Sequence, residues 1–131
     1  MTAEEYRARG YNVSRNIAQT AIDAAEDYIS RAYLVPVTGA KEIVDYNEDE
    51  KRTLAALVFL QMLQANGVFA TRAGAKTTAI ESSADASSET IMHAALARAR
   101  FELEELAKNY NVKPWKVVSD VCRLYFSTNY R

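Results

Sequence analysis

The segment Leu54–Leu63 constrains the fold of this chain more than any other part of it. It reads LAALVFLQML, and Gln61 is its only polar residue. As a helix, this segment is apolar nearly all round, and such a helix has to be enclosed by other elements. It has about half of the ~20 residues that a membrane-spanning helix requires. The segment therefore predicts a buried central helix in a soluble domain.

The scarcity of helix breakers extends this expectation to the whole chain. The 131 residues, a length typical of one domain, include four Gly and two Pro against 22 Ala. Apolar residues recur at helical spacing, and no segment alternates as a half-buried strand does. The sequence thus predicts an all-α fold: a small bundle of four main helices with a long central loop and a C-terminal extension, and no large sheet.

Capping signals and breakers predict where the helices begin and end. Thr2 and Glu5 have the spacing of a capping box, as do Asn47 and Glu50. Pro36 and Gly39 break the chain, so residues 34–46 are expected to form a connection. The expected helices are a short one over roughly 3–9 that Gly10 stops, a second from Asn12 or Ser14 to about Tyr33, a third after Asn47 to Gly67, a fourth from Asp85 or Ser87 to about Asn109, and a last one from Pro114.

The fourth of these helices carries an apolar stripe that predicts antiparallel packing against another helix. The stripe consists of Met92, Leu96, Ala99, Leu103 and Leu106. Outside the stripe, opposite charges stand four residues apart, and we interpret them as a solvated face with weak pairs along the helix. These pairs are Arg98–Glu102, Arg100–Glu104 and Glu104–Lys108.

Residues 68–88 differ in character from the rest of the chain. Fourteen of these 21 residues are Ala, Ser, Thr or Gly, so few could anchor a core. A structureless stretch of this length inside a compact domain is usually functional or disordered. Ala73-Gly74 is a weaker signal for a turn between short strands at 68–72 and 76–80. We interpret the stretch as an inserted loop.

The inventory of reactive residues argues against an enzyme. There is one cysteine and one histidine, so no intramolecular disulfide and no multi-thiolate zinc site is possible. Cys122 lies among apolar residues and is expected to be a core residue. No phosphate-binding loop, nucleophile motif or calcium loop occurs. We therefore predict no catalytic residue, no cofactor and no metal. The N-terminus lacks the apolar region of a secretory signal, and no membrane association is expected.

The charge balance bears on nucleic-acid binding. Lys and Arg number 16 against 17 Asp and Glu, which gives a net charge of −1. A protein held mainly by phosphate contacts is usually basic. A recognition helix over 114–126 would offer only Lys116 and Arg123 as bases. A small helical nucleic-acid-binding regulator thus remains the alternative hypothesis.

The last segment of the chain is rich in aromatic residues. It reads WKVVSDVCRLYFSTNYR from Trp115 onward. Such side chains are enriched in protein interfaces, but they could equally complete an intramolecular core. We hypothesise that residues 111–131 form a docking segment. Its anchors would be Trp115, Tyr125, Phe126 and Tyr130.

In the order of its features, the sequence resembles the head-tail connector (adaptor) proteins of tailed bacteriophages. The resemblance covers roughly residues 3–110. It begins with a short N-terminal helix ending at Gly10. There follow, in order, "IAQTAIDAAEDYISRAYLVPVTG", "EKRTLAALVFLQMLQANG", the loop "TRAGAKTTAIESSADASS" and the long helix "ETIMHAALARARFELEELAKN".

This resemblance implies a structural virion protein without catalysis. Residues 1–110 would form the connector domain of a ring, typically of twelve copies, that lies beneath the portal in the phage neck. The protein would be made in the host cytoplasm, would bridge the portal and the tail or stopper proteins, and would touch packaged DNA non-specifically along the channel. The inserted loop would make inter-subunit contacts through Arg72, Lys76, Thr77 and Thr78. Portal docking by residues 111–131 follows only by analogy with the family.

Overall fold

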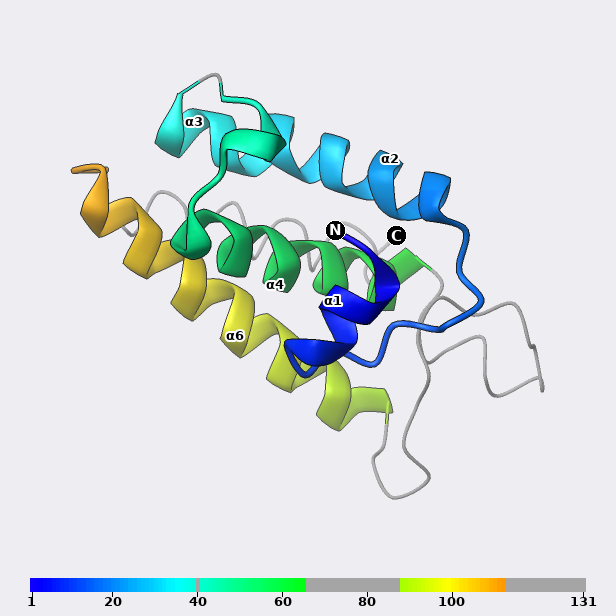
Figure 1. The fold of residues 1–131 in the computed structure, drawn as a ribbon. Helices are drawn as coiled ribbons and strands as arrows, with labels where there is room; N and C mark the ends of the chain where they lie inside the picture. The colour runs from blue at the N-terminus through cyan, green and yellow to red at the C-terminus, as the bar shows by residue number, and fades with distance from the viewer. Residues whose placement is uncertain (40, 66–87, 113–131) are drawn as a thin grey trace.

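The computed structural model describes residues 1–39, 41–65 and 88–112, and it confirms the all-α fold class. Within these ranges the chain forms helices and no strand (Figure 1). The elements are α1 (Ala3–Ala8), α2 (Gln19–Ile29), a π-helical segment (Ser30–Leu34), α3 (Val35–Thr38), a 3-10 turn (Ile43–Asp45), α4 (Glu48–Ala65) and α6 (Ser88–Asn109).

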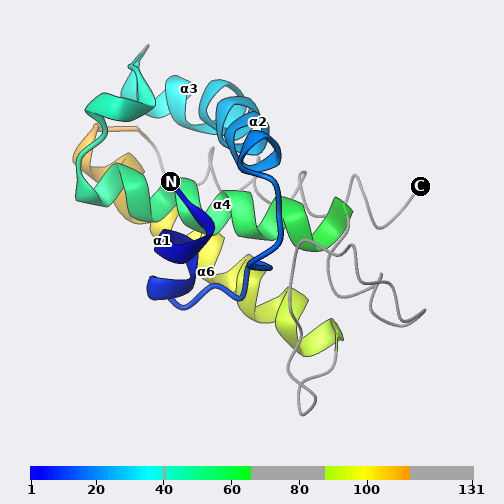
Figure 2. The same cartoon turned by 45° about the vertical axis from the view of Figure 1, so that its right-hand side comes forward.

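The three longest helices lie side by side, with α4 between α2 and α6 (Figures 1 and 2). Helices α2 and α6 run in one direction and α4 runs in the other, so the expected antiparallel packing of α6 is present. Helix α1 lies across α4 and α6 (Figure 2). The two helices that flank α4 thus turn their outer faces in opposite directions.

Helix α4 is the enclosed element that its sequence predicts. All eight residues from Thr53 to Leu60 are buried, which leaves no side of the helix open to water over these two turns. The helix begins with the expected capping box: the Glu50 amide donates to Asn47 Oδ1 at 2.9 Å, and the Asn47 amide donates to Glu50 Oε1 at 3.0 Å. Each large apolar side chain buried here contributes about 1.5–3 kcal/mol.

Helix α6 is amphipathic and ends at Asn109, as expected. Four of the five residues in its predicted stripe are buried and Leu96 is half-buried. The buried ones are Met92, Ala99, Leu103 and Leu106. The stripe faces α4, which confirms the predicted packing of these two helices.

The N-terminal part also follows its local signals. Thr2 and Glu5 form the capping box: the Glu5 amide donates to Thr2 Oγ1 at 3.2 Å and the Thr2 amide to Glu5 Oε1 at 3.1 Å. Gly10 ends this part with φ +93°, a left-handed conformation that side-chain-bearing residues rarely adopt.

The predicted start of the second helix at Asn12 or Ser14 is wrong, because α2 begins at Gln19. Tyr11 and Val13 are both buried, so the chain between α1 and α2 has to place two side chains in the core before it turns into the helix. Ser14 Oγ instead accepts the Asn16 amide at 3.2 Å within this connection.

The predicted end of that helix near Tyr33 is also wrong. The helical path continues through the π-helical segment into α3, and Gly39 ends it with φ +83°. Pro36 has no amide hydrogen to donate, and inside a helix its ring collides with the carbonyl four residues earlier. Because the wider π-helical turn precedes it, Pro36 occupies the first turn of α3, where proline is tolerated. The connection to α4 is therefore shorter than expected.

Candidate functional site

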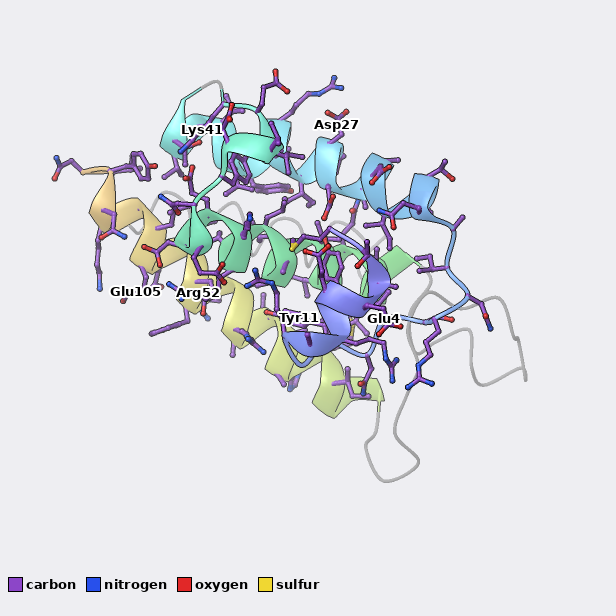
Figure 3. All side chains as sticks on the ribbon, in the orientation of Figure 1. Glu4, Tyr11, Asp27, Lys41, Arg52 and Glu105 are labelled. Carbon is purple, nitrogen blue, oxygen red and sulfur yellow. The ribbon has the colours of Figure 1, made fainter. Side chains whose placement is uncertain are left out.

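All eight residues that the sequence singled out as contact residues lie outside the described ranges. They are Arg72, Lys76, Thr77 and Thr78 in the inserted loop, and Trp115, Tyr125, Phe126 and Tyr130 in the C-terminal segment. These assignments, and the division at residues 110/111, stay predictions. The described residues nevertheless form several polar clusters and surfaces of their own (Figure 3).

The first cluster joins the segment that follows α1 to α4 and α6. The Tyr11 ring packs on Phe59 with 4.8 Å between the ring centroids, and the Arg98 guanidinium lies 4.4 Å from the centre of the same Tyr11 ring. Arg98 also donates to the Arg9 carbonyl at 3.4 Å, while Arg9 pairs with Glu48 at 2.8 Å. Burial raises the pKa of Tyr11 to about 12. This stack fixes α6 to the N-terminal part of the chain.

The second cluster surrounds the carboxylate of Glu26, which is 3% exposed on the inner side of α2. Both of its oxygens lie 3.0 Å from the Met1 ammonium, and the Tyr6 hydroxyl donates to Oε2 at 2.7 Å. Burial, followed by the neighbouring Glu26 charge, raises the pKa of Tyr6 far above its usual range. A buried carboxylate with a cation and a hydroxyl donor is fully compensated, and it locks α1 onto α2.

The third cluster lies at the start of α4. Glu50 is fully buried, and its Oε1 atom accepts the Asn47 amide and the Lys41 ammonium, the latter at 2.6 Å. Its Oε2 atom has no hydrogen-bond partner among the residues that the structure describes. The hydrogen bond to Glu50 raises the pKa of Lys41. This pair ties the connection before α4 to the helix itself, so we assign it a structural role.

A groove of about 430 Å³ lies between the first turns of α4 and the last turns of α6. Arg52, labelled in Figure 3, lines it. Arg52 forms a close ion pair with Asp49 and lies 3.8 Å from Glu102. Thr53 donates to the Glu102 carbonyl at 3.3 Å. Glu105, which pairs with Lys108 at 3.2 Å, and the ring of Phe101 also line the groove, so three carboxylates stand there against one guanidinium and the lining is net acidic.

A second depression, of about 340 Å³, lies beside the π-helical segment. Ser30 and Arg31 from that segment face Lys41 and Val44 from the connection before α4. Ser30 Oγ is 2.5 Å from the Tyr46 hydroxyl, and Arg31 pairs with Asp27. Ser30, Arg31, Asp27 and Lys41, which all line this depression, thus have partners within the chain.

Three large apolar side chains are exposed in the described part of the chain. Tyr28 on α2 is 50% exposed, Phe101 on α6 is 59% exposed, and Val44 in the 3-10 turn is 85% exposed. Exposed aromatic side chains of this kind are typical anchors of protein interfaces. They make the outer faces of α2 and α6 the strongest candidate contact surfaces of the described chain.

No three His, Cys, Asp or Glu side chains within the described ranges come together in a way that could hold a metal ion. His93, the one histidine, is exposed on α6. None of the helices in the described part is long and apolar enough to cross a membrane.

Sequence reasoning missed the residues that hold these elements together. Arg98 was assigned to a pair with Glu102 along the helix, but it lies over Tyr11, and Glu102 faces Arg52 on α4. Glu26 occupies an inward position of the α2 periodicity, next to Ile22 and Ile29. A carboxylate at an apolar position is the one sequence signal that could have indicated a buried pair.

Comparison of the chain with protein-family models, with curated proteins and with solved structures found no match.

Proposed function

We propose that this protein is a subunit of a head-tail connector ring in a tailed bacteriophage, where copies bridge the portal and the tail around the DNA channel. The observation that carries the proposal is the order of elements. A short capped helix, two long helices, a segment rich in small residues and a further long helix follow one another as in the connector resemblance. The two exposed aromatic faces support a role in contacts with other chains.

The charge arrangement favours this proposal over the nucleic-acid-binding regulator. Most basic side chains in the described part of the chain have a partner within it. Examples are Arg9 with Glu48, Arg31 with Asp27, Lys41 with Glu50, and Arg98 with the Tyr11 ring. Paired bases leave little net positive surface for the phosphate contacts that dominate nucleic-acid affinity. A ring subunit that only lies near DNA in the channel does not need a net positive surface.

Native mass spectrometry tests the proposal. The full chain is measured alone and with the portal protein of the same phage, and a complex of portal rings with a stoichiometric set of copies is the expected result. A chain that binds a defined duplex sequence tightly, and that does not join the portal, would support the regulator instead.

The hypothesis of a C-terminal docking segment has a separate test, the double truncation Phe126→Ala with Tyr130→Ala. Anchors of this type each cost about 2 kcal/mol or more when they are truncated at an interface. Docking predicts a folded variant with a near-normal melting temperature that fails to join the portal complex. A large drop in melting temperature, with assembly retained in the cold, would assign the two rings to the core.

A further inference from the structure

Two buried polar atoms on α4 have no hydrogen-bond partner among the residues that the structure describes. One is the Oε2 atom of Glu50, a residue that is fully buried in the first turn of the helix. The other is the Oε1 atom of Gln61, three turns further along. Buried acceptors in native proteins nearly always have a donor, because an unpaired one is costly. Each of these two atoms therefore calls for a donor from outside the described ranges.

The two atoms mark one side of α4. Glu50, Leu57 and Gln61, here called the α4 stripe, are seven and four residues apart, a spacing that places them on one face of a helix. Phe59, two residues after Leu57, points to the opposite side, where the Tyr11 ring packs on it. Helices α2 and α6 flank α4 (Figures 1 and 2). Leu57 is nevertheless fully buried, so the side that carries the stripe is covered as well.

The chain beyond α6 starts at the end of the stripe that holds Glu50. The first turns of α4 and the last turns of α6 lie together, since they form one groove. After α6, Asn111 has φ +58°, and the Val112 amide donates to the Ala107 carbonyl at 2.9 Å. This left-handed turn ends the helix and reverses the chain, and Val112 packs against the core. The next residues thus start from the core and not from the outer surface.

The sequence that follows has donors at a matching spacing. Nineteen residues come after the described part of the chain. In the helix expected from Pro114, one face consists of residues three, four and three positions apart: Trp115, Val118, Cys122 and Tyr125. The first and the last of these carry an N–H and an O–H donor, and on a helix they are about 15 Å apart along the axis. Glu50 and Gln61 are about 17 Å apart along α4.

We propose that residues 113–131 cover the α4 stripe of their own chain, as a helix parallel to α4. Trp115 then donates its indole N–H to Glu50 Oε2, and Tyr125 donates its hydroxyl to Gln61 Oε1. The apolar side chains between these two donors pack over Leu57. Both orphaned acceptors gain a partner in this way, and the buried carboxylate keeps the Lys41 ammonium as its counter-charge.

This contact lies within one chain, so it is independent of the connector proposal. It takes Trp115 and Tyr125 out of the set of portal anchors, because their rings are then buried against α4. It leaves Phe126 and Tyr130 for docking, and their double truncation remains the test of that role.

The fluorescence of Trp115 tests the contact directly, because this is the only tryptophan of the chain. Emission and acrylamide quenching of the full chain are measured over a dilution series down to the monomer, which analytical ultracentrifugation verifies. We expect emission at a shorter wavelength than in concentrated guanidinium chloride, and several-fold weaker quenching, at every concentration. A ring that is quenched as readily as in the unfolded chain overturns the proposal. Protection that disappears on dilution also overturns it, since the ring then lies between copies.

A double-mutant cycle tests the register. Gln61→Leu leaves the Tyr125 hydroxyl without its acceptor, Tyr125→Phe leaves Gln61 without its donor, and the double variant removes both groups. We expect each single variant to unfold at a lower urea concentration than the original chain, and the double variant to be at least as resistant as either single one. Circular dichroism checks that all variants fold.

The matched control combines Gln61→Leu with Tyr28→Phe, a change to an exposed tyrosine on α2, and its effects should simply add. Losses that also add in the double variant of Gln61 and Tyr125 overturn the proposed pair. A Gln61→Leu variant more stable than the original chain overturns it too, because the amide oxygen then has no donor to lose.

Discussion

The central helix and the two helices that flank it use the same kinds of residue in different ways. Helix α4 buries every side from Thr53 to Leu60, whereas α2 and α6 each bury one stripe and expose the opposite face. The flanking helices are also fastened by polar contacts, through Glu26 on α2 and Arg98 on α6. In the described chain, α4 therefore supplies stability, and the flanking helices supply the surface available for contacts.

The largest expected effect is a loss of stability on truncation of a buried side chain in α4, compared with an exposed side chain on α6. Leu57→Ala in α4 removes a fully buried side chain and should lower the free energy of unfolding by about 2–5 kcal/mol, because it leaves a cavity that the surroundings fill only partly. Phe101→Ala on α6 is the matched control and should stay within about 0.5 kcal/mol. Urea denaturation measures both, and equal losses would show that Phe101 belongs to the core.

The second-largest effect is expected at Glu26, whose contacts with Met1 and Tyr6 hold α2 against the N-terminal part of the chain. Glu26→Gln leaves the buried Met1 ammonium without its counter-charge, and we expect a loss of about 3 kcal/mol. Asp27→Asn, one position along on the exposed side, should cost under about 1 kcal/mol because its partner Arg31 is solvated. Chemical denaturation measures the free energy of unfolding of both variants. A Glu26 variant as stable as the original would contradict the assigned role of this carboxylate.

A smaller effect concerns alkaline pH. The pKa of Tyr11 is raised to about 12, so the folded chain keeps a proton that the unfolded chain loses near pH 10. The contribution to stability is complete below pH 10 and is lost as the pH rises toward 12; Tyr6 adds to the loss in the same direction. The melting temperature should therefore fall over this range, and Tyr11→Phe should flatten the fall. Tyr28→Phe, on an exposed ring, is the control.

The smallest expected effect on stability comes from the segment that joins α4 to α6. When residues 68–87 are replaced by a short Gly-Ser linker, the melting temperature should stay nearly unchanged, because few of these residues could anchor a core. Assembly should be impaired, since Arg72 and Lys76 are the predicted contacts with acidic neighbours. If the replacement unfolds the domain, burial of α4 depends on this segment, and the segment then contributes to stability together with α4.

Local signals in the sequence were sufficient for the class of fold and for its central element. The capping boxes at Thr2 and Asn47, the stop at Gly10 and the all-round apolar character of α4 act within a few residues of the chain. The stripe on α6 likewise follows from the helical period alone. Such features hold wherever the helix is placed, so they could be predicted without the tertiary structure.

Tertiary structure decided the features that depend on distant partners. Helix α2 starts at Gln19 because Tyr11 and Val13 have first to reach the core. The helical path continues past Pro36 because the π-helical turn places this proline in the first turn of α3. Arg98 lies over Tyr11, a residue 87 positions away, and not beside its neighbour four residues along α6. No local pattern encodes such a choice, because a charged side chain takes the partner that folding brings within reach.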